Sequence, residues 1–294
     1  MPPSVSVLCT VHQDGWSSQG NKADPAMWRL QRAMLRNLTS LHGHAVQLDL
    51  QVAARGLKHS MLSITPAQDA SAMILLEDDL EVSPLLFAYA AAFASRYSAQ
   101  ATNATTKTPT VLLGVNLFTD KADYMTRYPP RPLHLPTGPL ATGVPSSWGA
   151  LYLGKSFERF QDWVVYEHGV DNQVSLPSAL RGASQWPSKN SWKKYLVSYM
   201  LSHEAYMLTV NFNRGSLVSN QAVRGVHTSQ GVVDSTRWAM QPYPLLRLQD
   251  LQQLRQEGLD PSAVCSSSRF EQSSLDVYDA AWVKRVAFVG GATQ

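Results

Sequence analysis

The sequence contains little cysteine and no excess of charge of one sign, and each of these features excludes a class of protein. The two cysteines, Cys9 and Cys265, lie far apart and cannot by themselves form a disulfide framework or a thiolate zinc site. With 25 basic and 22 acidic residues the formal net charge is only +3. Because there is also no cluster of five Lys or Arg residues, nucleic acid is not an expected partner.

Long apolar runs are also missing. No stretch of about twenty residues is apolar throughout, so we expect no transmembrane segment in this chain. The first residues, MPPSVSVLCTV, lack a charged region followed by a long apolar stretch, so we expect a soluble chain without a targeting signal. A catalytic domain whose membrane anchor lies outside this sequence is the open alternative.

The chain does have enough apolar residues for a large core, since 44% of its 294 residues are hydrophobic. Short β-branched or apolar runs predict strands at 4–11, 45–52, 72–76, 110–118, 150–154 and 206–212. Apolar residues at helical spacing predict helices from Pro25 to Leu41 and at 55–64, 85–97, 156–166 and 192–203. Strands that alternate with helices indicate an α/β fold with a mainly parallel sheet.

Two segments depart from this alternation. Residues 128–148 are rich in proline and glycine, which predicts a long irregular loop, and such loops are often functional. From Pro242 onward a helix with leucines at 248, 251 and 254 is followed by a serine-rich stretch. We therefore expect one domain over 1–240 and a helical appendage over 241–294.

Three consecutive carboxylates, Glu77, Asp78 and Asp79, follow the strand predicted at 72–76. In an open α/β sheet, ligands bind just beyond the carboxyl ends of the strands. Two carboxylates about 4 Å apart repel by roughly 4 kcal/mol at an effective dielectric constant near 20, and a divalent cation relieves that repulsion. Oxygen ligands suit Mn²⁺ or Mg²⁺ bound together with substrate phosphates. The other interpretation is a solvated strand end whose acids favour the start of the next helix.

The run LLEDDLEVSPLLFAYAAAF resembles the acid motif of GT-A glycosyltransferases, in the form found in N-acetylglucosaminyltransferase I and its relatives. The stretches at 145–163, 191–212 and 219–227 are similar to a eukaryotic family of glycosyltransferase-2-like proteins of plants, algae and fungi. The resemblance covers about residues 4 to 230. It implies a GT-A fold, a Rossmann-like and mostly parallel sheet flanked by helices.

The same resemblance implies an activity, a metal-dependent transfer of a sugar from a nucleotide-diphosphate donor to a hydroxyl of a glycan or glycoprotein. A UDP-sugar is the first candidate for the donor, Mn²⁺ or Mg²⁺ for the cofactor, and the Golgi or secretory pathway for the location. The motif matches assign metal contacts to Asp79 and His227, with an ordinary loop histidine as the alternative for His227. They assign donor contacts to Thr10, Arg55, Lys58, Glu77 and Asp78, and the acceptor side to Trp148 and Gly149.

Trp148 has two interpretations, either an indole that stacks on a sugar or a core anchor for the strand that follows.

The catalytic base is a separate question. Inverting members of the class carry an acid where this chain has Lys193 and Lys194. A base from elsewhere, a retaining reaction, or lysines that contact the diphosphate are the three explanations, and a solvated helix face is the alternative for the lysines. The candidate bases are Asp162, Asp171 and Glu204, each more often a surface charge.

Only about 65 residues separate the first strand from the acid motif, so the N-terminal half of the expected domain is short. This shortness and the missing acid motivate a second hypothesis, a degenerate GT-A domain that binds a glycan or a protein without catalysis. A third hypothesis is a nucleotidyltransferase of related architecture, which the lack of a glycine-rich phosphate loop disfavours.

Overall fold

The computed structural model describes residues 9–13, 40–41, 44–50, 62, 64, 71–76, 80–102, 111–126, 131–146, 148–184, 191–220, 244–271 and 274–285. The chain divides into two compact units, one formed by residues 1–69 and 187–192 and the other by 70–186 and 193–294. Most of the two helices expected from Pro25 and over 55–64 lies outside the described residues, as do residues 4–8 of the first expected strand.

The first unit contains a three-stranded sheet in the order β1-β3-β2. Strand β1 (Cys9–Gln13) pairs in parallel with β3 (His44–Leu50), and β2 (Ser40–Leu41) pairs with β3 in the antiparallel direction. Strand β3 confirms the strand expected at 45–52, whereas β1 ends two residues later than expected. Leu41 was expected in a helix and instead pairs with His44, so the helical interpretation is wrong at this residue.

The second unit is built on a seven-stranded sheet in the order β14-β13-β9-β11-β6-β10-β4. Its strands are β4 (Ala72–Leu75), β6 (Leu112–Asn116), β9 (Gly138–Thr142), β10 (Ala150–Leu153), β11 (Tyr206–Asn211), β13 (Asp276–Tyr278) and β14 (Lys284–Arg285). Strands β4, β6, β10 and β11 confirm four sequence predictions. Only the pairs β6/β11 and β9/β13 are parallel, so this sheet is mixed and the expectation of a mainly parallel sheet is wrong for it.

The mixed directions follow from the connection between β6 and β10. Its described part contains the short strands β7 (Ala122–Asp123), β8 (Arg131–Pro132) and β9, and antiparallel neighbours need no helical crossover. The segment 128–148, expected to be irregular, therefore supplies an inner strand of the sheet. Pro139 fits in β9 because the partner strand β13 pairs only from Leu140 onward.

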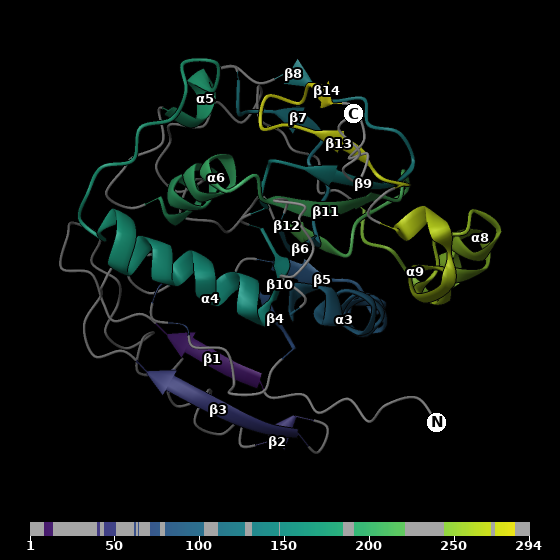
Figure 1. The fold of residues 1–294 in the computed structure, drawn as a ribbon. Helices are drawn as coiled ribbons and strands as arrows, with labels where there is room; N and C mark the ends of the chain where they lie inside the picture. Colours follow the sequence, from purple (N-terminus) through teal and green to yellow (C-terminus); the bar gives the residue numbers. More distant parts are fainter. Residues whose placement is uncertain are drawn as a thin grey trace, which may run out of the picture. The chain divides into compact units, whose positions relative to one another are not determined.

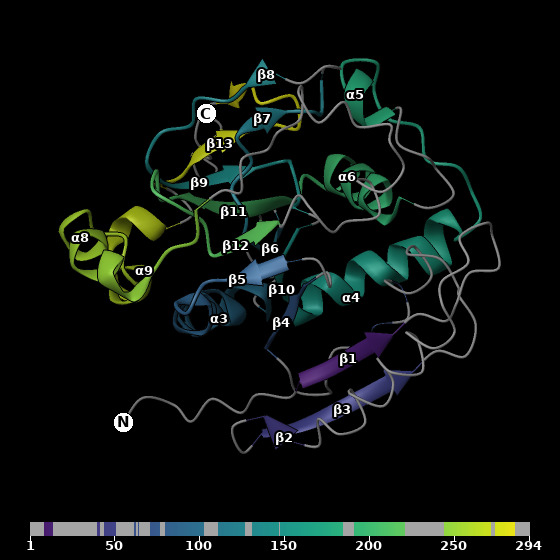
Figure 2. The ribbon, with the colours of Figure 1, turned by 180° about the vertical axis from the view of Figure 1, so that it is seen from behind.

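Helices cover both faces of the second unit's sheet (Figures 1 and 2). Helix α3 (Leu86–Thr102) lies on one side, and α4 (Gly154–Asp162) and α6 (Trp192–Ser202) lie on the other. All three were expected, although α4 continues into a π-helix, η1 (Trp163–His168). A short helix, α5 (Arg181–Ser184), precedes α6. None of the helices in the described part of the chain is long and apolar enough to cross a membrane.

Strand β10 shows how one apolar run serves two core layers. Leu151 and Leu153 join the hydrophobic cluster that includes Phe93 of α3, whereas Tyr152 lies 4.9 Å from Phe157 of α4 between ring centroids. Successive side chains of a strand point to opposite faces, so a fully apolar strand packs against helices on both sides. All four residues of β10 are buried, as this arrangement requires.

The C-terminal segment packs on α3 in the same compact unit. It contains η2 (Leu248–Asp250), α8 (Leu251–Gln256), α9 (Pro261–Ser266) and η3 (Ser268–Phe270), and then joins the sheet through β13. The Tyr89 hydroxyl donates to the Leu259 carbonyl at 2.6 Å, and the Tyr97 hydroxyl donates to the Phe270 carbonyl at 2.5 Å. The region expected to be an appendage therefore shares the core of α3.

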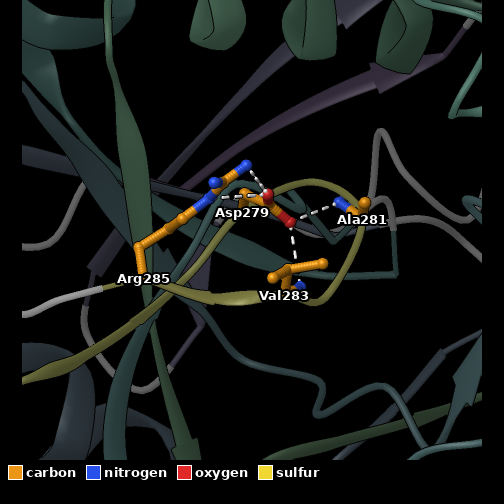
Figure 3. A network of polar contacts seen from close by, with 4 residues as sticks. All are labelled: Asp279, Ala281, Val283 and Arg285. Atoms are coloured by element: carbon orange, nitrogen blue, oxygen red, sulfur yellow. Dashed lines mark hydrogen bonds and ion pairs between the residues drawn. The ribbon is translucent and has the colours of Figure 1, made fainter.

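The last described turn is closed by a single carboxylate (Figure 3). Asp279 Oδ1 accepts hydrogen bonds from the backbone N–H groups of Ala281 and Val283, each at 2.9 Å, and Oδ2 accepts from Arg285 Nε at 2.9 Å. These contacts hold β14 against β13 at the end of the sheet.

The Tyr97 hydrogen bond gives a test of the packing between α3 and the C-terminal segment. Burial is the main cause that raises the pKa of Tyr97 to about 12, so its hydroxyl remains a donor at neutral pH. We predict that Tyr97→Phe lowers the free energy of unfolding by about 1–3 kcal/mol, because the buried Phe270 carbonyl loses its donor. Urea unfolding measures this, with Tyr166→Phe as the control, since Tyr166 is 80% exposed. Equal changes in the two variants would contradict the role given to Tyr97.

Candidate functional site

The candidate site lies at the edge of the sheet where β4, β6 and β11 end, which we call the carboxyl edge. Strand β10 runs in the opposite direction, so it begins at this edge, and its first residue, Ala150, pairs with both Leu75 and Asn116. The residues just beyond the strand ends, Leu76 and Leu117, therefore lie next to Gly149, the residue that precedes β10. Ligands of open α/β sheets collect at such an edge.

The acid triplet Glu77, Asp78 and Asp79 lies outside the described residues, but the residues on both sides of it are described. Leu76 precedes the triplet, and β5 (Leu80–Val82) follows it. Strand β5 pairs in the antiparallel direction with β12 (Val218–Asn220), and the register sets Leu80 opposite Asn220. The chain that enters β5 and the chain that leaves β12 therefore share one end of this two-stranded sheet.

Ser83 fixes the chain as it leaves β5. Its backbone N–H donates to the Leu217 carbonyl at 2.8 Å, and its hydroxyl donates to the Leu246 carbonyl at 2.7 Å. The same hydroxyl accepts from the backbone N–H of Leu85 at 3.0 Å. This last bond caps the start of α3, and Pro84 suits the position after the cap because no N–H donor is needed there.

Gly149 lies beside Leu76, the residue that precedes the acid triplet, and Trp148 is its neighbour in the chain. The Gly149 carbonyl accepts from the backbone N–H of Leu117 at 3.1 Å, and its α-carbon faces Leu76 and Val218. The Trp148 ring meets Phe118 edge to face, with centroids 4.9 Å apart, and is only partly buried. The anchoring contact and the remaining exposure are compatible with both interpretations of Trp148.

A buried amide connects three segments at the carboxyl edge. Asn116 Nδ2 donates to the Val144 carbonyl at 2.9 Å and to Thr209 Oγ1 at 2.8 Å. Asn116 Oδ1 accepts from the backbone N–H of Ser146 at 2.8 Å. Both Nδ2 donors and the acceptor are used, so the side chain fixes the loop before Trp148 to the ends of β6 and β11.

A second polar cluster joins Asp120 and Tyr124, which follow β6, to Lys193 in the first turn of α6. Asp120 is 3% exposed and accepts a hydrogen bond from the Tyr124 hydroxyl, and Lys193 Nζ lies 4.9 Å from the centroid of the Tyr124 ring. Burial raises the pKa of the Asp120 carboxyl, while the charge of Lys193 and the Tyr124 hydrogen bond act to lower it. Burial also raises the pKa of Tyr124, and the charge of Asp120 adds to this effect.

Nearby, Lys121 Nζ donates to Asn211 Oδ1 at 2.8 Å, and burial lowers the pKa of this lysine. Lys193 and Lys194 are 7% and 5% exposed, and Lys194 Nζ donates to the Ser184 carbonyl at 3.1 Å. The interpretation of these two lysines as a solvated helix face is therefore wrong. Cations are unfavourable in the first turn of a helix, and for Lys193 the nearby Asp120 charge offsets that cost.

The three candidate bases named from the sequence, Asp162, Asp171 and Glu204, are all exposed. Glu204 lies just before the start of β11, which is the opposite edge of the sheet from Leu76. All three residues are therefore surface charges, which was the alternative interpretation of each.

The structure describes only some of the residues predicted to bind the donor or the metal ion. Arg55, Lys58 and His227 lie outside the described residues, as does the triplet itself. Thr10 was expected at the end of the first strand, but it is the second residue of β1 and pairs with Gln47. It belongs to the first unit, whereas Trp148 and Gly149 belong to the second.

Sequence reasoning missed Asn116, Asp120, Tyr124 and Thr209. For Asp120 and Tyr124 a signal was available, because they follow the strand predicted at 110–118 in the same way as the acid triplet follows another, whereas Asn116 and Thr209 lie within predicted strands. Among the residues that the structure describes, no group of three His, Cys, Asp or Glu side chains is arranged to hold a metal ion.

The second unit is thus an α/β domain with polar residues gathered where its strands end. A scan against protein-family models found no family that matches this chain, and a search of curated proteins found no significant match.

The raised pKa of Asp120 predicts a pH-dependent stability. Because its folded pKa lies above the unfolded value of about 3.9, its contribution is full below that value and is lost as pH rises through the folded pKa. We predict that Asp120→Asn gains stability relative to the native chain as pH increases from about 4. Urea unfolding between acidic and neutral pH measures the difference, with the exposed Asp171→Asn as control. A pH-independent difference for Asp120→Asn would refute the prediction.

Proposed function

We propose that this chain is a glycosyltransferase of GT-A type that transfers a sugar from a nucleotide-diphosphate donor to a hydroxyl of a glycan or glycoprotein. The donor proposed first is a UDP-sugar. The proposal combines the acid motif at 77–79 with the position of its flanking residues at the carboxyl edge of an α/β sheet. The GT-A architecture itself, a Golgi address and the donor sugar belong to the proposal.

The pairing of β5 with β12 is the observation that carries it. Asp79 is bonded directly to Leu80, and His227 follows Asn220 by seven positions, while Leu80 and Asn220 are opposite one another. One Cα step is about 3.8 Å, and seven residues reach at most about 25 Å. Two residues far apart in sequence are thus tied to one short sheet, and the segment between Asn220 and His227 is short enough to permit a cation shared with Asp79.

The chemistry of this donor set fits Mn²⁺ or Mg²⁺, because carboxylates are hard oxygen ligands and a neutral imidazole suits Mn²⁺. Such an ion, when bound, would act as a Lewis acid and stabilise the negative charge of the departing nucleoside diphosphate. Glu77 and Asp78 would approach the ribose and diphosphate, and Trp148 would contact the acceptor. Their contribution would be positioning and electrostatic stabilisation.

A second candidate function is a GT-A-like domain that binds a glycan or a protein without catalysis. It is favoured by the first turn of α6, where Lys193 and Lys194 are buried in the place expected for a catalytic acid. A retaining transfer, or a base from outside the described residues, would reconcile these lysines with catalysis. The two candidates differ in whether the chain binds a nucleotide with a metal ion.

The proposal predicts UDP binding that depends on Mn²⁺ and on Asp79. In isothermal titration calorimetry of the whole chain we expect micromolar affinity for UDP with Mn²⁺ and little without it. Asp79→Ala and His227→Ala should each weaken Mn²⁺-dependent binding by about tenfold or more, as loss of metal-site residues commonly does. A screen of UDP- and GDP-sugars for Mn²⁺-dependent hydrolysis or transfer then identifies the donor.

The control is Glu158→Gln, which alters an exposed carboxylate of α4 and should leave binding unchanged. Absence of any Mn²⁺-dependent nucleotide binding would favour the non-catalytic candidate. Unaltered binding in Asp79→Ala would remove the metal assignment.

A further inference from the structure

We propose that Gly149 is a positioning residue for the acid triplet. Its bare α-carbon lets the Trp148–Gly149 loop close on Leu76, which precedes the triplet, and on Val218 of β12, whose partner strand β5 follows the triplet. This role rests on the proposed function, in which the triplet holds the donor and its cation. Gly149 itself would touch neither.

The geometry leaves no room for a side chain at this position. Gly149 is buried and has a φ of +111°, a conformation that residues with a Cβ rarely adopt. A Cβ placed on it would lie 3.1 Å from Val218 Cγ2, 3.3 Å from Leu76 Cδ2 and 3.4 Å from Val218 Cγ1. The first two distances are shorter than ordinary van der Waals contacts, so a neighbour would have to move.

The two neighbours differ in how easily they move. Leu76 is 41% exposed, so its side chain has space to rotate away. Val218 is fully buried, belongs to the hydrophobic cluster of α3, and is paired with Val82 of β5. The strain of an added methyl group would therefore fall on β12 and pass to β5.

This packing couples the acceptor side to the donor side. Trp148, adjacent to Gly149, rests on Phe118, while β5 begins at the residue that follows Asp79. A ligand that shifts the Trp148 loop would press on Val218, which pairs with Val82 at the end of β5, two residues beyond the start of that strand. Packing at Gly149 would thus link the position of Trp148, on the acceptor side, to the position of β5, on the donor side.

Hydrogen–deuterium exchange of Gly149→Ala tests this coupling without reference to activity. Backbone strain at such a position predicts roughly 5- to 100-fold faster exchange in β5 and β12. The strands β13 and β14 should exchange as in the native chain. Gly138→Ala is the matched control, because Gly138 has a similar φ of +119° but its added Cβ would meet only the flexible guanidinium of Arg269.

A double-mutant cycle with Val218→Ala locates the contact. Val218→Ala removes two of the three close atoms, so adding it to Gly149→Ala should increase exchange by less than the product of the two single effects. If Gly149→Ala does not fold, Val218→Ile enlarges the same contact from the other side and should speed exchange in β5, whereas Val277→Ile on β13 should not.

Titration with UDP and Mn²⁺ distinguishes failure of this inference from failure of the proposed function. In a chain that binds, we expect Gly149→Ala to weaken Mn²⁺-dependent binding at least fivefold and Gly138→Ala to have no such effect. Equal affinity in Gly149→Ala, or unchanged exchange in β5 and β12, overturns the role of Gly149. No binding by the native chain overturns the proposed function, and the exchange result alone then decides whether Gly149 holds the flanks of the triplet.

Discussion

The pairing of Ala150 with both Leu75 and Asn116 is the constraint on which the candidate site depends. Because β10 enters the sheet between the ends of β4 and β6, the residues just outside the strands meet at one place. Leu76, Leu117 and Gly149 are each one residue beyond this pairing. A parallel strand in the place of β10 would end at this edge instead of beginning there, and Trp148 would lie at the far side of the sheet.

The polar side chains of Asn116 and Asp120 are buried and form hydrogen bonds within the protein. Asn116 connects β6, β11 and the loop before Trp148, and Asp120 is held by Tyr124 beside Lys193. A buried carboxylate beside a buried lysine is costly to separate, because either charge left alone would be poorly solvated. The edge is therefore stiff below its surface, which suits a site whose ligands need fixed positions.

Most strands and helices of the second unit could be predicted from the sequence, because their apolar residues follow either a strand or a helix pattern. Their ends also carry clear signals, such as Ser83 and Pro84. The direction of the strands could not be predicted, because a buried strand such as β10 has the same apolar sequence pattern whether its neighbours are parallel or antiparallel. Strand β9 was also missed, since Pro139 is unusual in a strand and is tolerated only where no donor is needed. The position of Asp120 after a predicted strand was visible in the sequence, but its burial beside Lys193, more than seventy residues away, was not.

The attachment of α3 to the C-terminal segment has a consequence for how the chain matures. Tyr89, Arg96 and Tyr97 bond to backbone carbonyls about 170 residues later. During synthesis, α3 emerges from the ribosome long before these partners exist. Its three side chains therefore lack their acceptors until residue 270 has been made. A product ending before residue 259 would lack every one of these acceptors. Premature termination near the end of the message would thus disturb the helix that starts just behind the acid triplet.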